Sequence, residues 1–209
     1  MKKTYAALIL NVAIVILEGL GFYSARGLGW EQFCYYTQIS NLFLGLISLI
    51  LVGFLLRYIR DGVSVPAWVS FLKYSATIMT AQTFLVSLFV LSPMMGGVGL
   101  LMLGPIVRYF HTLCPLLAIV SFLLVDFKAL SFTRQHTLLA MIPTMLYAVV
   151  AITLNILRIW QGPYPFLYVY EQPIWMSCVW LVVIMGAAYL IAFLLRVIHR
   201  RLSHEYVYR

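Results

Sequence analysis

The chain has 209 residues, of which 64% are hydrophobic and only 10% are charged. Soluble domains carry about 25% charged residues, so this composition excludes a water-soluble globular protein and indicates a membrane protein. The formal net charge of +8 comes from basic residues that stand singly between apolar blocks. This pattern is typical of membrane topology signals and does not indicate a nucleic-acid-binding surface.

Six segments are apolar enough, and close enough to the required length of about 20 residues, to cross a bilayer as helices. We expect these spans at roughly 4–24, 34–57, 68–92, 108–127, 137–158 and 174–198. The first apolar segment has no small-residue cleavage site before Gly27, so we expect an uncleaved span and not a signal peptide. The segment 98–107 is too short to cross and is expected to be a re-entrant or interfacial connection. The sequence therefore predicts one all-α transmembrane domain over 1–209, a helical bundle of about six spans.

The distribution of lysine and arginine predicts the orientation of the bundle, because basic residues concentrate on the cytoplasmic side. If the N-terminus lies inside, eleven basic residues fall on the inner side and three on the outer side. The inner residues are Lys2, Lys3, Arg57, Arg60, Lys73, Lys128, Arg134, Arg196, Arg200, Arg201 and Arg209, and the outer ones are Arg26, Arg108 and Arg158. We therefore expect both termini in the cytoplasm. Lys73, near the inner end of the third span, is expected to reach water or headgroups.

Polar side chains are costly in hydrocarbon, so their positions within the spans are informative. With this topology, most of them gather toward the outer side of the membrane. They are Glu18 in the first span, Thr37, Gln38 and Asn41 in the second, Arg108 and His111 in the fourth, Asn155 and Arg158 in the fifth, and Tyr164 in the last outer loop. Three interpretations are open: interfacial anchors and helix caps, a polar network that holds the helices together, or a catalytic or binding cavity that opens outward.

Helical spacing favours an organised site over scattered anchors. Residues three or four positions apart share one face of a helix. Three spans show such pairs at their outer ends: Thr37 and Asn41, Arg108 and His111, and Asn155 and Arg158. Each of these helices thus presents a polar stripe, which anchoring in the headgroup region does not require.

The residue types in these stripes are those of nucleophilic catalysis. The Thr37 hydroxyl is a weak nucleophile until a base accepts its proton, and His111 is the candidate base. Glu18 is a candidate for orienting the imidazole or stabilising its protonated form. The candidates for stabilising an oxyanion are Asn41, Asn155 and Arg158.

No metal or cofactor site is expected. His111 has no histidine or carboxylate at ligand spacing, and the other histidines fall on the inner side. The three cysteines, Cys34, Cys114 and Cys178, show neither metal-ligand spacing nor a disulfide framework. Small buried cysteines in a helical bundle are the commoner explanation for such residues.

Three short motifs carry a family resemblance. They are YYTQISN at 35–41, RYFHTLCP at 108–115 and LNILRIWQGPYPFL at 154–167. Together, at these positions relative to the spans, they resemble the androgen-induced and androgen-dependent membrane protein family and its bacterial integral-membrane relatives. The resemblance implies a small protein of about six spans. It also implies hydrolysis of fatty acid esters of hydroxy fatty acids by an intramembrane threonine and a histidine.

The resemblance extends to individual positions. Thr37 occupies the place of the family's threonine nucleophile, and His111 occupies the place of its histidine base. The family's YPFL sequence in the last outer loop is present from Tyr164 to Leu167. The sequence following the threonine, QISN, is closer to the bacterial members, which implies a multi-pass protein of the bacterial inner membrane.

The expected function is therefore an intramembrane lipid-ester hydrolase at the outer side of the membrane, with a fatty acyl ester from the bilayer as substrate and no nucleic-acid partner. One alternative is a non-enzymatic lipid- or solute-binding or transport protein with an outward-facing polar cavity, in which Arg108 or Arg158 captures an anionic group. A second alternative is a membrane acyltransferase that uses the same pair, or Cys114 in place of Thr37.

Overall fold

The structure is a computed structural model that describes residues 2–124 and 131–204 of the chain. Within these ranges the chain forms helices and connecting loops, with no β-strand. Lys128 and Arg209, which contribute to the predicted charge asymmetry, lie outside the described residues, as does the predicted end of the fourth span. The prediction of an all-α protein is confirmed.

Among the described residues, five helical segments are long and apolar enough to cross a membrane, which confirms a multi-pass architecture. They comprise α1 (Lys2–Ser24), α2 (Tyr36–Asp61), α3 (Ala67–Val86) extended by η2 (Ser87–Leu91) and α4 (Ser92–Met94), α7 (Arg134–Leu139) followed by α8 (Ile142–Ile156), and α9 (Ile174–His204). The remaining predicted span is shorter in the described residues, where η3 (Tyr109–Leu113) and α6 (Cys114–Leu124) together cover Tyr109–Leu124. The connection predicted at 98–107 contains a short helix, α5 (Val98–Leu103).

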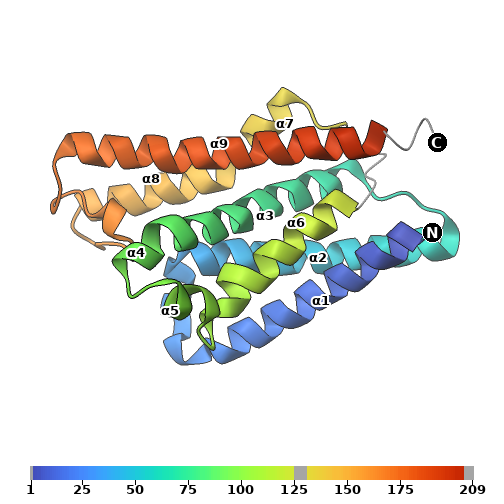
Figure 1. Ribbon diagram of the computed structural model, residues 1–209, viewed down its shortest axis with the longest axis horizontal. Coiled ribbons are helices and arrows are strands. Elements are labelled where there is room, and N and C mark those ends of the chain that lie inside the picture. The colour runs from blue at the N-terminus through green and yellow to red at the C-terminus, as the bar shows by residue number, and fades with distance from the viewer. Residues whose placement is uncertain (1, 125–130, 205–209) are drawn as a thin grey trace.

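The helices lie side by side in an elongated bundle (Figure 1). α1 begins and α9 ends at one end of the bundle, which we call the proximal end; α1 ends and α2 begins at the opposite, distal end. α3 has the most buried apolar segment of the five long helices. It packs against α2, α6 and α9, and apolar residues such as Leu44, Ile78 and Ala118 join these helices in one core.

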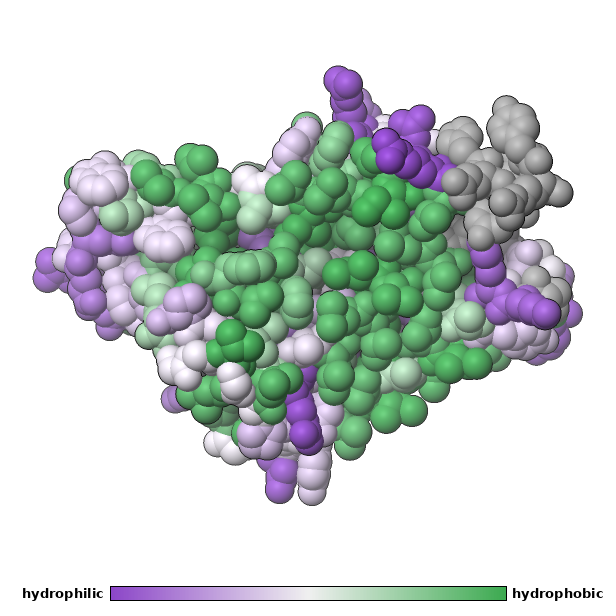
Figure 2. All heavy atoms as spheres, viewed as in Figure 1, coloured by the Kyte–Doolittle hydropathy of each residue, from purple (hydrophilic) through white to green (hydrophobic). Residues whose placement is uncertain are grey.

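The outer surface of the bundle is apolar. Figure 2 shows a broad hydrophobic area across the middle of the visible face, with hydrophilic side chains toward its margins. α8 and α9 expose large aliphatic residues such as Val149, Val150 and Val182. Such residues are stable against lipid tails, and the helices satisfy their own backbone hydrogen bonds, as crossing the bilayer requires.

Proline divides the fifth apolar segment into two helices. Pro143 lies in the first turn of α8, where the missing amide hydrogen removes no intrahelical bond. α7 ends just before it, and the Ser75 hydroxyl donates a 3.0 Å hydrogen bond to the carbonyl of Ala140 at the break. The segment predicted as one helix at 137–158 is therefore interrupted, and its longer half ends near the distal end.

Gly21 allows η3 to approach α1 closely. A Cβ atom on Gly21 would lie 2.7 Å from Cε1 of Phe110, whose ring is buried and packs on Phe22 with centroids 5.0 Å apart. We expect Gly21→Ala to lower the free energy of unfolding by about 1–3 kcal/mol, because the ring has to shift within a packed core. Thermal unfolding in detergent measures this effect. Gly19→Ala is the matched control: nothing lies within 4 Å of its added Cβ, so equal destabilisation of both variants would contradict the packing argument.

Candidate functional site

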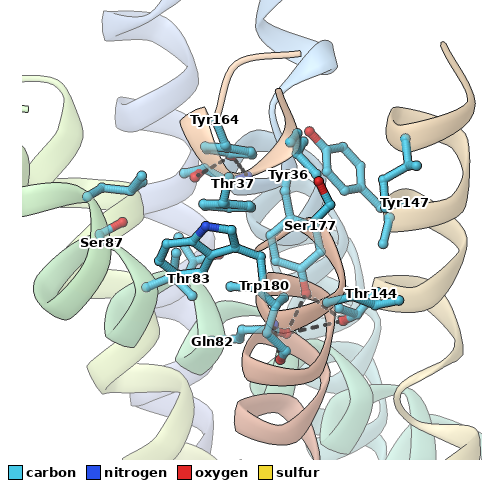
Figure 3. Close-up of a pocket in the computed structure, with 18 of the residues that line it drawn as sticks. Tyr36, Thr37, Gln82, Thr83, Ser87, Thr144, Tyr147, Tyr164, Ser177 and Trp180 are labelled. Carbon is cyan, nitrogen blue, oxygen red and sulfur yellow. Dashed lines mark hydrogen bonds between the residues drawn. The ribbon is translucent and has the colours of Figure 1, made fainter. Parts of the chain in front are cut away.

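A cavity lies in the distal half of the bundle. Its volume is about 800 Å³ when the solvent-filled space at its entrance is included. Its walls come from α2, α3 with η2, α8, α9 and the loop around η4 (Pro165–Leu167). Most of the lining is apolar or aromatic, including Leu181, Ile184 and Trp180. The indole of Trp180 lies between two groups of polar side chains, one at each end of the cavity (Figure 3). An apolar cavity with a few polar groups suits a ligand that has an aliphatic body and a small polar group.

Thr37 lines this cavity at the first turn of α2. The chain enters α2 from an extended residue, Tyr35, so the backbone N–H of Thr37 has no intrahelical acceptor. This N–H donates to the Tyr164 hydroxyl at 3.3 Å, and the Thr37 and Tyr164 side-chain oxygens are 3.4 Å apart (Figure 3). The Tyr164 ring in turn stacks on Phe166, with centroids 5.2 Å apart. The structure thus brings together the predicted nucleophile and the predicted tyrosine of the last loop.

A second polar group lies at the other end of the cavity. The Tyr36 hydroxyl is 2.6 Å from Oγ1 of Thr144 and 3.3 Å from Oε1 of Gln82, while Nε2 of Gln82 donates to the Ile184 carbonyl at 3.0 Å. Figure 3 shows these three side chains joined by hydrogen bonds across three helices. These hydrogen bonds connect α2, α3, α8 and α9, so the cluster holds the four helices together around the cavity.

Sequence reasoning did not single out Tyr36, Gln82 or Thr144. The signal that points to Gln82 is its place in the third span, among the hydroxyl residues Thr80, Thr83 and Ser87, all of them buried. A buried glutamine in hydrocarbon needs partners on other helices. Tyr36 and Thr144 supply them, but their positions depend on how α2 and α8 pack, which the residue pattern does not specify.

His111 lies outside the cavity lining, in the π-helical turn η3. Its Nδ1 is 2.6 Å from the carbonyl oxygen of Leu101. A carbonyl only accepts hydrogen bonds, so Nδ1 carries the proton and Nε2 is the basic nitrogen. The orienting partner is therefore the Leu101 carbonyl, whereas the sequence pointed to Glu18. Within the described part of the chain, no hydrogen bond joins the side chains of His111 and Thr37.

Asn41 connects the segments that carry Thr37 and His111. Its Nδ2 donates to the carbonyl of Thr37 at 2.8 Å and to the carbonyl of Phe110 at 3.1 Å. Two oxygens bonded to the same nitrogen lie within about 6 Å of each other. Because Phe110 immediately precedes His111, the two predicted catalytic residues belong to backbone segments that are held side by side.

The other predicted site residues occupy different places. Asn155 holds the last distal loop: it donates to the Gln161 carbonyl, and its Oδ1 accepts from the Val169 backbone at 3.3 Å. Arg108 and Arg158 are both exposed and lie over tyrosine rings, and neither lines the cavity. Arg158 also has a left-handed backbone (φ 56°) at the end of α8.

Glu18 and Gln38 are buried away from the cavity lining. Glu18 lies between α1, α2 and α6, with its side chain 3.4 Å from the Cβ position of Gly45 and beside Cys114. Gln38 is buried, and its Oε1 has no hydrogen-bond partner. Of the predicted residues, the structure thus places Thr37 and Tyr164 at the cavity, whereas Glu18 of α1 and Gln38 of α2 do not line it.

Lys73 contradicts the sequence-based expectation. It was expected to reach water or headgroups, but its side chain is completely buried and donates a 2.9 Å hydrogen bond to Oγ of Ser48. The sequence placed it near the end of a span, where a long side chain reaches the surface. That expectation is wrong because α3 is the central helix and α2 covers this face.

Comparison of the chain with protein families, with curated proteins and with solved structures finds no match. The interpretation of the cavity therefore rests on its residues and geometry. Within the described residues, no group of three histidine, cysteine, aspartate or glutamate side chains could hold a metal ion, and Cys34, Cys114 and Cys178 are free thiols.

Tyr164 provides a pH-dependent test of the cavity. Burial raises the pKa of its phenol above the ordinary value of 10.0, and its hydrogen bonds with Thr37 offset only part of this effect. A raised pKa in the folded state stabilises the fold below the pKa of the unfolded tyrosine, and this contribution is lost as the pH rises through the folded value. We expect wild-type protein to be more stable than Tyr164→Phe by about 0.5–1.5 kcal/mol near neutral pH. Thermal unfolding should show this difference shrinking above about pH 10; a difference that is constant or grows with pH would contradict it.

Proposed function

We propose that the chain is an intramembrane lipid-ester hydrolase in which Thr37 is the nucleophile and His111 the general base, as the family that the sequence resembles implies. The observation that carries this proposal is the position of Thr37. Thr37 lines the apolar cavity, while Asn41 holds its backbone beside the segment of His111. The fixed tautomer of His111, with the basic Nε2 free of the Leu101 bond, is the one that a general base requires.

The proposed reaction begins with the acyl chain of a lipid ester in the apolar cavity and its ester carbonyl near Thr37. Nε2 of His111 accepts the Thr37 proton, directly or through one water, as the Thr37 oxygen attacks the carbonyl carbon. The Tyr164 hydroxyl and the N-terminal end of α2 lie beside Thr37. In the proposed reaction they stabilise the negatively charged oxygen of the tetrahedral intermediate. The alcohol then leaves with a proton from His111, and a water activated by His111 releases the fatty acid from Thr37.

The proposal includes a topology with six spans, in which the segment beginning at Tyr109 crosses as the sixth. Both termini then lie in the cytoplasm, and the distal end with its cavity lies at the outer side of a bacterial inner membrane. This arrangement is supported by the common end at which α1 begins and α9 ends, since an even number of crossings returns the chain to its starting side (Figure 1). It is also supported by the excess of lysine and arginine that the proximal side would carry.

Covalent labelling tests the proposal directly. Purified protein in lipid nanodiscs is treated with a long-chain fluorophosphonate, and the modified peptide is identified by mass spectrometry. We expect the adduct on Thr37, and its formation should require His111. Hydrolysis of a fluorogenic long-chain acyl ester should occur in the same preparation and be inhibited in proportion to labelling. Absence of both the adduct and the hydrolysis would exclude the hydrolase. A new ester formed with an added lipid alcohol would instead indicate acyl transfer.

One observation favours a second function, lipid binding without turnover. The Thr37 hydroxyl is next to Tyr164 and, in the part of the chain that the structure describes, has no hydrogen bond with His111 that would activate it as a nucleophile. In this alternative, Thr37 and Tyr164 bind the polar end of a lipid whose chain fills the cavity. Saturable binding of a fatty acid, lost in Trp180→Ala and unaccompanied by labelling or hydrolysis, would favour this function.

A further inference from the structure

A second polar region lies where α1 packs against α2 and α6. Five buried oxygen atoms in this region have no hydrogen-bond donor within the described residues: Oδ1 of Asn11, Oε1 and Oε2 of Glu18, Oε1 of Gln38 and Oδ1 of Asn41. All are acceptors on side chains that are more than nine-tenths buried. Unpaired acceptors in a membrane interior are costly, so a concentration of them indicates that something donates hydrogen bonds there.

These residues form a column along the bundle axis. On α2, positions 38, 41, 45 and 48 follow one another at intervals of three and four, which places them on one face. On α1, Asn11 and Glu18 are two turns apart, as are Cys114 and Ser121 on α6. Contacts join them across the helices, because Asn11 donates to Ser121 at 2.8 Å and Glu18 touches the Gly45 position. We call this set the polar column: Asn11, Glu18, Gln38, Asn41, Ser48, Lys73, Cys114 and Ser121.

Two ionisable groups of the polar column lie within electrostatic range of each other. Within the described residues, Lys73 and Glu18 form no ion pair, and the one hydrogen bond that the Lys73 ammonium donates goes to Ser48. The Cys114 thiol lies beside the carboxylate, but a thiol is a weak donor, and neither carboxylate oxygen has a hydrogen bond of standard geometry. Charges buried in this way require further donors to be stable.

We propose that the polar column is a hydrated proton-exchange site, in which Glu18 binds and releases a proton and Lys73 is the neighbouring basic group. Water supplies the missing donors: each molecule donates two hydrogen bonds and accepts from the Lys73 ammonium. A hydronium transfers its proton to the Glu18 carboxylate and leaves as water, and the reverse step restores the carboxylate.

A proton suits this site better than a metal cation. Within the described residues the site has a single carboxylate, that of Glu18, and the ammonium of Lys73 repels a metal ion held there. The titratable groups around Glu18 are Lys73 from α3 and Cys114 from α6, and His111 in η3 precedes Cys114 by three residues; the polar-column residues of α2 are uncharged. Gln38 and Asn41 continue the column toward the distal end. The site does not depend on the chemistry proposed for Thr37.

Infrared difference spectroscopy across a pH step tests the proposal on the full chain reconstituted in lipid vesicles. We expect a carboxylic-acid C=O band that appears on acidification, shifts in D₂O because water reaches the group, and is absent in Glu18→Gln. Glu31→Gln is the control, since Glu31 is exposed and the band should persist. A wild-type spectrum with no such band at any pH at which the protein is folded, or a band that does not shift in D₂O, would overturn the proposal.

A second measurement uses only wild-type protein, in case Glu18→Gln does not fold. Dicyclohexylcarbodiimide reacts with protonated carboxyl groups in apolar surroundings, and mass spectrometry locates the adduct. We expect modification of Glu18 that falls about tenfold for each pH unit above its midpoint, as the protonated fraction does. Modification that is absent, or that does not vary with pH, would contradict proton exchange at Glu18.

Discussion

Thr37→Ala is expected to reduce hydrolysis of a long-chain acyl ester by about 10³-fold or more, because no other hydroxyl replaces the attacking oxygen. Thr37→Ser keeps the hydroxyl and should retain activity within about tenfold of wild type. Initial rates in nanodiscs, at saturating and limiting ester, measure both effects. A fall in kcat with little change in KM would identify a group that acts on the reaction and not on ester binding.

A matched control separates the Thr37 hydroxyl from threonine in general. Thr153 lies near the end of α8 at the same end of the bundle, but it is exposed and does not line the cavity. Thr153→Ala should therefore have wild-type activity. If Thr37→Ala instead hydrolyses the ester at nearly the wild-type rate, Thr37 is not the nucleophile. The cavity would then serve in binding, or the nucleophile would be another residue.

Lys73→Met is expected to lower the free energy of unfolding by about 3–5 kcal/mol, because it leaves the buried Glu18 carboxylate without its counter-charge. The double variant Glu18→Leu with Lys73→Met should recover most of this loss, since both charges are then gone from the core. Thermal unfolding of the four proteins of this cycle in one detergent measures the coupling. Coupling below about 0.5 kcal/mol would show that the two charges act independently.

Arg57→Met is the control for the removal of a basic residue. Arg57 is exposed near the end of α2, so its replacement should change stability by no more than about 0.5 kcal/mol. If Lys73→Met were equally neutral, the buried Lys73 ammonium would not be the partner that Glu18 requires.

The sequence predicted the helical segments well because hydropathy reports directly on transfer into lipid. It also placed Thr37, Asn41 and Tyr164 near one another, since helix spacing and end assignment follow from the spans alone. It did not predict that Glu18 and Lys73 face each other, because the rotation of α1 and α3 about their axes depends on side-chain packing across the whole interface. The same reason explains why Gln82 and Thr144 were missed as part of the cavity.

The prediction for Arg158 failed for a different reason. Arg158 was a candidate for an oxyanion site or an anion-binding group because it follows Asn155 at helical spacing. The helix ends at Ile156, however, and the left-handed backbone at Arg158 turns the chain, so the spacing no longer places both side chains on one face. Periodicity is informative only within a helix, and the last turn is where its prediction is weakest.

The amide group of Asn41 serves both polar regions of the molecule at once. Its nitrogen donates a hydrogen bond to the Thr37 carbonyl and so fixes the backbone at the cavity. Its oxygen belongs to the polar column, next to Gln38 in the order of residues along α2. A change in protonation at Glu18 that reorients this amide would therefore shift the hydroxyl of Thr37, although no atom of Glu18 lines the cavity. Protonation of Glu18 on one side of α2 and lipid binding in the cavity on the other side would then be coupled through Asn41.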